Sequence, residues 1–115
     1  MKNLLKFDIE YSDEILYIRL HGKLIKKAYL KINNYIIPAI KKHNIKYIIY
    51  NLENLYDIDE TGVDALLKTK LLVKNNGGRI IACGCSNEVL EKIKRLKIKV
   101  VETERNGKLI IKVNM

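Results

Sequence analysis

Short apolar runs of strand length alternate along the chain with longer segments of helical period, and this alternation is the strongest constraint on the fold. The runs are rich in Ile, Val and Tyr, which favour strands. The expected strands are residues 4–10, 15–21, 46–52, 79–83, 98–104 and 108–113. The expected helices, in which apolar side chains recur every three to four residues, are residues 24–43, 61–75 and 86–96. Strands that are separated by helices must cross over, so we expect the middle of the sheet to be parallel.

The connections between these segments carry turn and helix-end signals. Ser12-Asp13-Glu14 predicts a turn that makes the first two strands an antiparallel hairpin, and Asn106-Gly107 predicts a second hairpin near the C-terminus. Asn44 and Asn76-Gly77-Gly78 are stop signals for the first two helices. Pro38 lies inside the first helix and predicts a kink near Asn34, because proline lacks a backbone donor and clashes with the preceding turn.

These segments predict an α/β fold in the order β-β-α-β-α-β-α-β-β. The sheet is expected to be mixed, with about five to six strands and three or more helices packed on it. A chain of 115 residues fits one domain, residues 1–115. No apolar run approaches the ~20 residues of a membrane helix, and the start MKNLLKFDIEY lacks the apolar core of a signal peptide. We therefore expect a cytoplasmic protein that does not insert into membranes.

The distribution of charge along the chain helps to choose between a nucleic-acid partner and a protein partner. The chain has a formal net charge of +9, which raises the question of nucleic acid. However, the lysines are spread over the whole chain, and only four of the 22 basic residues are Arg, the residue most used for reading base edges. We expect no specific nucleic-acid partner. The acids are concentrated instead: five of the thirteen, Glu53, Asp57, Asp59, Glu60 and Asp64, form an acidic segment that favours docking of a protein partner.

The motif search gives no catalytic or cofactor site. There is no phosphate loop, no dinucleotide loop after a strand and no H-E-x-x-H sequence. Cys83 and Cys85 form C-G-C without the second ligand pair of a zinc site, so we expect buried or half-buried free thiols and no metal. The clustered carboxylates carry no sign of the pocket that acid–base chemistry needs. We expect a binding protein, no enzyme and no cofactor.

Thr61 stands where the central helix is expected to begin. With Asp64 three residues later, it resembles a capping box, in which the Thr hydroxyl accepts a helix amide and the acid reaches back. One interpretation is that Thr61 only caps the helix. The other is that an exposed hydroxyl at a helix start, where the dipole tolerates anions, accepts a phosphate. The residues alone leave both open.

The segment after residue 52, ENLYDIDETG, is expected to be a loop. The element order and this loop together resemble the STAS domain family, in particular the bacterial anti-sigma factor antagonists. The matching stretch is YIIYNLENLYDIDETGVDALLKTKLLVKNNGGRIIACG, and LYIRLHGKL resembles the second strand and its G-x-L turn. The family sequence D-S/T-x-G opens a helix that leucines follow. Asp59 corresponds to its acid, Thr61 to its phosphorylated residue and Gly62 to its glycine. The resemblance covers roughly residues 5 to 103.

The resemblance implies a partner-switching regulator. In the family, the unphosphorylated protein binds an anti-sigma factor with a serine/threonine kinase fold, is released when that kinase phosphorylates the loop, and is reset by a phosphatase. Thr61 would be the acceptor. The residues expected to contact the partner are Asp57, Asp59, Glu60, Gly62 and Asp64.

Three positions differ from the family pattern. Glu60 replaces the first serine of the motif, and Ile25 stands where the family often has an acid. The third is KLIIKV, which predicts a strand where the family usually ends in a helix. The alternative function is a STAS-like scaffold or ligand-binding module, in a stress-signalling or lipid-transport assembly, without a phosphoswitch.

Overall fold

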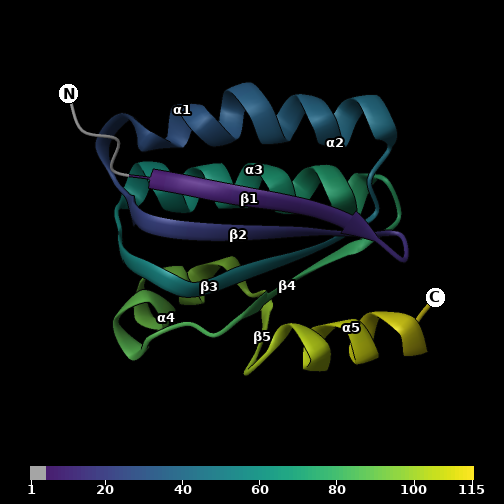
Figure 1. Cartoon of the computed structure of the whole chain (residues 1–115). Coiled ribbons are helices and arrows are strands. Elements are labelled where there is room, and N and C mark those ends of the chain that lie inside the picture. Colours follow the sequence, from purple (N-terminus) through teal and green to yellow (C-terminus); the bar gives the residue numbers. More distant parts are fainter. Residues whose placement is uncertain (1–4) are drawn as a thin grey trace.

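The computed structural model describes residues 5–115, which form one five-stranded sheet with helices on both faces (Figure 1). The strands are β1 (Leu5–Ser12), β2 (Ile15–Leu24), β3 (Tyr47–Ile58), β4 (Arg79–Cys83) and β5 (Lys99–Val101). They follow the order β1-β2-β3-β4-β5, with β1 antiparallel to β2 and every other pair parallel. The expected α/β class and mixed sheet are therefore confirmed.

The β1–β2 hairpin turns on Asp13 and Glu14, as the sequence predicts. Both residues have positive φ values, 54° and 67°, which matches the twist that a two-residue hairpin needs. Ser12 pairs with Ile15 directly below the turn. This tight turn fixes the register of all eight pairs between the two strands.

The first helical segment is continuous but irregular. Its bounds are η1 (Lys26–Ala28), α1 (Tyr29–Lys31), the π turn η2 (Ile32–Ile36) and α2 (Ile37–His43). The irregularity expected near Asn34 is this π turn, in which the Ile37 amide bonds to the Ile32 carbonyl just before Pro38. Asn44 ends the segment in a left-handed conformation, as expected.

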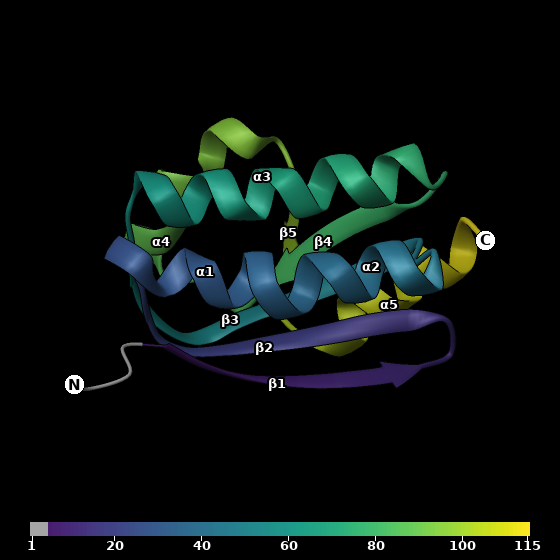
Figure 2. The same ribbon diagram turned by 90° about the horizontal axis from the view of Figure 1, so that it is seen from above.

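The remaining helices are α3 (Glu60–Asn75), α4 (Asn87–Ile93) with the 3-10 turn η3 (Lys94–Leu96), and α5 (Glu104–Val113). Seen from above, α3 lies beside α1 and α2 over the sheet (Figure 2). The helix α5 lies below the sheet (Figure 1). The expected stop at Asn76-Gly77-Gly78 and the start at Ser86 are both confirmed.

The two faces of the sheet carry cores of different size. The larger core joins the strands to α1–α3 and α4, through side chains such as Ile36, Leu66 and Val89. The smaller core lies under α5 and contains Ile15, Tyr17, Ile49, Ile81, Cys83 and Ile111. No helix within residues 5–115 is long and apolar enough to cross a membrane.

Two expected elements are wrong. The segment after residue 52 was expected to be a loop, but β3 continues to Ile58, because Leu55 and Ile58 bury their side chains in the larger core. The expected last hairpin is instead the helix α5. Thr103 caps it by accepting the Asn106 amide, and Gly107 packs directly against the sheet. The strand expected at KLIIKV, the third difference from the family pattern, is therefore not observed.

Candidate functional site

The candidate site is the junction where β3 ends and α3 begins. Asp59 is extended and is the N-cap of α3, Glu60 is the first helical residue, and Thr61 is the second. The Thr61 side chain is exposed, whereas Gly62 and Val63 behind it are buried. The junction thus places one hydroxyl at the surface, in the first turn of the central helix.

The expected capping role of Thr61 is wrong. The cap is Asp59, whose Oδ1 accepts the Gly62 amide at 3.2 Å. The Thr61 hydroxyl lies 2.5 Å from the same Asp59 oxygen and 3.0 Å from the Lys26 carbonyl oxygen, so it acts as a donor. Asp64 does not reach back to the helix start but contacts Arg95. An acid immediately before the helix is the stronger cap here because its two oxygens accept several donors.

Asp59 joins three parts of the chain. Its Oδ2 accepts the Lys26 amide at 2.7 Å, and the Asp59 amide donates to the Leu24 carbonyl at 3.2 Å. The beginning of α3 is therefore fastened to the connection between β2 and η1. Partial burial raises the pKa of Asp59, but the hydrogen bonds from Thr61, Lys26 and Gly62 outweigh it and lower the pKa below its ordinary value.

Gly62 permits this close approach. A Cβ atom at this position would lie 2.4 Å from the Leu24 carbonyl oxygen and 2.8 Å from a side-chain carbon of Ile58. A backbone oxygen cannot move aside as a flexible side chain can, so only glycine fits. The structure gives Gly62 a packing role and buries it, and its expected contact with a partner stays a prediction.

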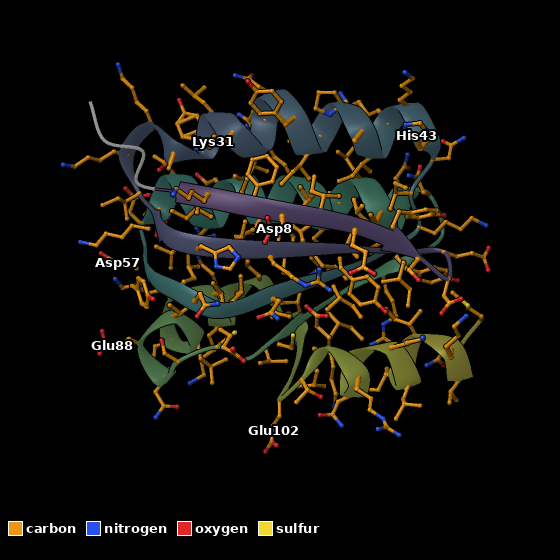
Figure 3. All side chains as sticks on the ribbon, viewed as in Figure 1. Asp8, Lys31, His43, Asp57, Glu88 and Glu102 are labelled. Atoms are coloured by element: carbon orange, nitrogen blue, oxygen red, sulfur yellow. The ribbon has the colours of Figure 1, made fainter. Side chains whose placement is uncertain are left out.

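The other predicted acids lie at the surface, paired with bases of the α4–η3 segment. Arg95 contacts Glu60 at 2.7 Å and Asp64 at 3.3 Å. Asp57 pairs with Lys92 at 2.6 Å, and this hydrogen bond lowers the pKa of Asp57. Asp57 lies at the same end of the molecule as Glu88 of α4 (Figure 3).

Three residues of the site were missed by the sequence reasoning. Lys26, Lys92 and Arg95 lie 31 to 35 positions from their acidic partners. No spacing rule links positions so far apart. Only Lys92 and Arg95 carried a general sequence signal. Basic side chains near the end of a helix interact favourably with the helix dipole and are usually exposed, so they are available to pair with acids.

A shallow hollow lies on the other side of Thr61, between α3 and the first helical segment. Its volume is about 240 Å³, and its lining residues are Tyr29, Asn33, Thr61, Asp64, Ala65 and Lys68. The hydroxyl of Thr61 is thus reachable from solvent past a polar rim. This geometry leaves Thr61 at the surface, beside an open hollow rather than inside an enclosed pocket.

Comparison with known proteins places this chain in a family. Residues 6–108 match the model of the STAS domain. The fold is similar to the unphosphorylated form of the anti-sigma factor antagonist SpoIIAA, with 26% identity over 95% of this chain and 98% of that one, and a TM-score of 0.76. The phosphorylated form of the Bacillus cell fate determinant SpoIIAA matches with 25% identity over 94% and 99% of the two chains, also at 0.76.

The same fold occurs in proteins of other kinds. The murine anion transporter Slc26a9 matches over 88% of this chain but only 18% of its own length, with 13% identity and a TM-score of 0.75, which shows the fold alone. The family match spans most of the chain, and the similarity of the whole fold to SpoIIAA agrees with it. This chain belongs to the STAS domain family.

Proposed function

We propose that this chain is a partner-switching regulator of the anti-sigma factor antagonist type. Unphosphorylated, it binds an anti-sigma factor with serine/threonine kinase activity in the cytoplasm; phosphorylation of Thr61 releases it, and a phosphatase resets it. In this role the chain is a binding module and a kinase substrate, without catalytic activity of its own. The observation that carries the proposal is the exposed Thr61 hydroxyl in the first turn of α3, in a chain similar to a protein solved in both phosphorylation states.

The hydrogen bonds of Thr61 give the switch a physical mechanism. A phosphorylated threonine has no hydroxyl proton, so the bonds to Asp59 and to the Lys26 carbonyl are both lost. The phosphate also adds about −1.5 to −2 charges next to the Asp59 carboxylate. Repulsion then turns the modified side chain outward, and a partner that fits the compact loop no longer fits it.

Glu60 is compatible with this mechanism. It replaces a neutral residue of the family pattern, but its carboxylate is paired with Arg95 at 2.7 Å. Arg95 also contacts Asp64, so one guanidinium partly balances two acids beside the acceptor. The additional charge of the phosphate is therefore the main electrostatic change that a partner meets at this surface.

The test is phosphorylation by serine/threonine kinases of the anti-sigma factor type from the same organism, with labelled ATP. We expect one label, which Thr61→Ala abolishes. Ser86→Ala and Thr103→Ala are matched controls, because these hydroxyls also stand at helix starts but accept helix amides as caps. We expect both controls to be labelled normally. Thr61→Glu should weaken binding to the kinase at least tenfold, because it adds a like charge beside Asp59. Absence of label, together with unchanged binding by Thr61→Glu, would contradict the proposal.

A second candidate is a STAS-like scaffold or ligand-binding module without a phosphoswitch. It is favoured by one observation, the structural use of the Thr61 hydroxyl as a donor to the Lys26 carbonyl. In that case Thr61→Ala costs about 1 kcal/mol of stability and leaves partner binding unchanged. Partner binding by Thr61→Glu separates the two candidates, because only the phosphoswitch requires the added charge to weaken it, whereas unphosphorylated Thr61→Ala should bind in both cases.

A further inference from the structure

The strand β1 forms an open edge of the sheet. It pairs with β2 on one side, and no element within residues 5–115 pairs with its other side. Figure 2 shows β1 along the outer border of the molecule, away from α3 and α4. An edge strand of eight residues carries a row of backbone donors and acceptors that can pair with another chain. In Figure 2 the helices α1 and α2 lie between this edge and α3, which carries Thr61, so the edge is a different surface from the proposed switch.

The hairpin turn determines which backbone groups point outward. In a two-residue hairpin, the residues that flank the turn exchange both hydrogen bonds, and these pairs alternate along the strand. Ser12 flanks the turn, so the even-numbered residues of β1 bond to β2 and the odd-numbered ones face the open edge. The contact from Lys31 Nζ to the Leu5 carbonyl agrees with this assignment, and a carbonyl oxygen with two lone pairs can accept a second donor.

The same odd-numbered residues carry apolar side chains that are only partly covered. Leu5 is buried and Phe7 half-buried, but Ile9 is 43% and Tyr11 59% exposed. Tyr35, 64% exposed, stands above the strand with its ring 6.3 Å from that of Phe7. The open edge is therefore bordered by an apolar strip that water reaches.

The other face of β1 carries charges in an order that can match itself. Lys6, Asp8 and Glu10 alternate with the apolar residues and are all exposed. In an antiparallel pair of two β1 strands centred on Phe7, Lys6 of each copy lies opposite Asp8 of the other. Centring on Ile9 would place Asp8 opposite Glu10. Centring on Asp8 would place two Asp8 carboxylates together; it would also bring Lys6 opposite Glu10, but Glu10 already contacts Arg19 of its own copy at 2.9 Å. Like charges directly opposite each other are destabilising, so Phe7 is the favoured centre.

We propose that β1 binds β1 of a second copy of this chain, antiparallel and centred on Phe7. The two sheets then form one continuous sheet of ten strands. On one face the two Phe7 rings lie next to each other and Ile9 of each copy packs beside Leu5 of the other. On the opposite face two Lys6–Asp8 pairs form, and these pairs select the register. Their attraction also opposes the repulsion between two copies that each carry a net positive charge.

Charge reversal tests the proposal, with sedimentation over a range of concentrations as the measurement. Wild type should dimerise reversibly. Lys6→Asp alone and Asp8→Lys alone each place like charges opposite one another twice, and we expect dimerisation to weaken about tenfold in each. When the two variants are mixed, each copy supplies the charges that the other lacks, so a heterodimer should form with wild-type affinity. Lys42→Asp and Glu102→Lys are matched controls, because these exposed residues lie outside β1 and carry the same changes of charge.

Three results would overturn the proposal. One is a wild-type protein that is monomeric at millimolar concentration. Another is a dimer that neither single variant weakens, which would place the interface elsewhere. The third is failure of the mixture to dimerise, which would exclude the register centred on Phe7. Circular dichroism of each variant shows whether it is folded, and restored association in the mixture could not come from unfolded chains.

Discussion

Asp59 is the residue on which the candidate site depends most. It accepts the Gly62 amide as a helix cap, accepts the Lys26 amide from the preceding connection and lies 2.5 Å from the Thr61 hydroxyl. A single ionised side chain thus orients the proposed phosphate acceptor. The stability that it contributes follows from its lowered pKa.

The first prediction concerns the pH dependence of that contribution. A carboxyl whose pKa is lowered by folding stabilises the protein above its unfolded pKa, about 3.9 for Asp, and this stabilisation is lost as the pH falls through the folded value. We expect Asp59→Ala to cost about 1 kcal/mol at pH 7 and less below about pH 4. Urea unfolding of both proteins across this range measures the difference.

The control for this prediction is Ser86→Ala. Ser86 caps α4 with a neutral hydroxyl that accepts the Val89 amide, so its cost of about 1 kcal/mol should not depend on pH. An Asp59→Ala cost that is the same at low and neutral pH would show that the carboxylate charge contributes nothing to the cap.

The second prediction concerns Gly62, where two effects have opposite signs. Alanine is better than glycine in a helix interior by about 1 kcal/mol. However, the added Cβ would lie 2.4 Å from the Leu24 carbonyl oxygen, and such overpacking costs about 1–3 kcal/mol or more. We expect Gly62→Ala to be destabilised in urea unfolding, whereas Lys68→Ala, exposed on the same helix, should change stability by less than about 0.5 kcal/mol. A Gly62→Ala protein more stable than wild type would contradict the close approach.

At the scale of elements, α5 is held to the sheet by a half-buried ion pair as well as by its small core. Arg19 donates to both Glu104 oxygens at 2.7 and 2.8 Å, and Asn51 donates to one of them at 2.9 Å. The hydrogen bonds from Arg19 lower the pKa of Glu104. Glu104 stands in the first turn of α5, so these bonds also fix where the helix begins.

The third prediction follows from this contact. Glu104→Ala leaves the Arg19 guanidinium with fewer acceptors and should cost about 1.5–3 kcal/mol in urea unfolding. Glu102 is the matched control, since it lies two residues earlier, is exposed and points away from the molecule (Figure 3). Glu102→Ala should change stability by less than about 0.5 kcal/mol. Equal effects of the two substitutions would show that the ion pair does not hold α5 in place.

The elements also show what the sequence could predict. The first hairpin, the parallel centre and the ends of the first three helices follow from local patterns, because the turn residues and the apolar periods agree there with the final packing. The prediction of a last hairpin was wrong because Ile110, Ile111 and Val113 favour strands locally. Its helical state depends on the Thr103 cap and on Gly107, which packs beside Ile49, and tertiary packing overrides local propensity.

The candidate site was also predicted only in part, because local sequence patterns do not show contacts between distant segments. Asp59, Thr61 and Gly62 were found because they are adjacent and match a short pattern. The exchange of roles between Thr61 and Asp59 was missed, because the acceptor for the Thr61 proton includes the Lys26 carbonyl, 35 residues away. Contacts between distant segments depend on the register between β2 and β3, which includes irregular steps near His21 and Lys23.

At the scale of the whole molecule, the reactivity of the two cysteine thiols measures how often the folded protein opens locally. Cys83 lies in the small core and is 1% exposed, and burial raises the pKa of its thiol to about 12. Cys85 is half-buried, and burial raises its pKa as well. The thiolate is the nucleophile that attacks a thiol reagent, so a raised pKa makes both cysteines react slowly in the folded state.

The fourth prediction is an order of reaction. We expect Cys85, measured in a Cys83→Ser protein, to react at least tenfold faster than Cys83 in a Cys85→Ser protein at the same pH, because a fully buried thiol reacts only when the core opens. In urea above the unfolding midpoint the two rates should become equal. Equal rates in the native protein would mean that the sheet around Cys83, between β3 and β5, opens independently of the rest.

The carboxylate of Asp59 also makes the junction between β3 and α3 observable by NMR. The amide protons of Lys26 and Gly62 both point at this one group, although they are 36 residues apart in the chain. Their resonances should therefore move together when Asp59 gains a proton, and move again, without any added label, when the Thr61 hydroxyl is replaced. Two ordinary backbone signals can thus follow, in solution and in real time, the chemical state of a side chain that neither residue carries.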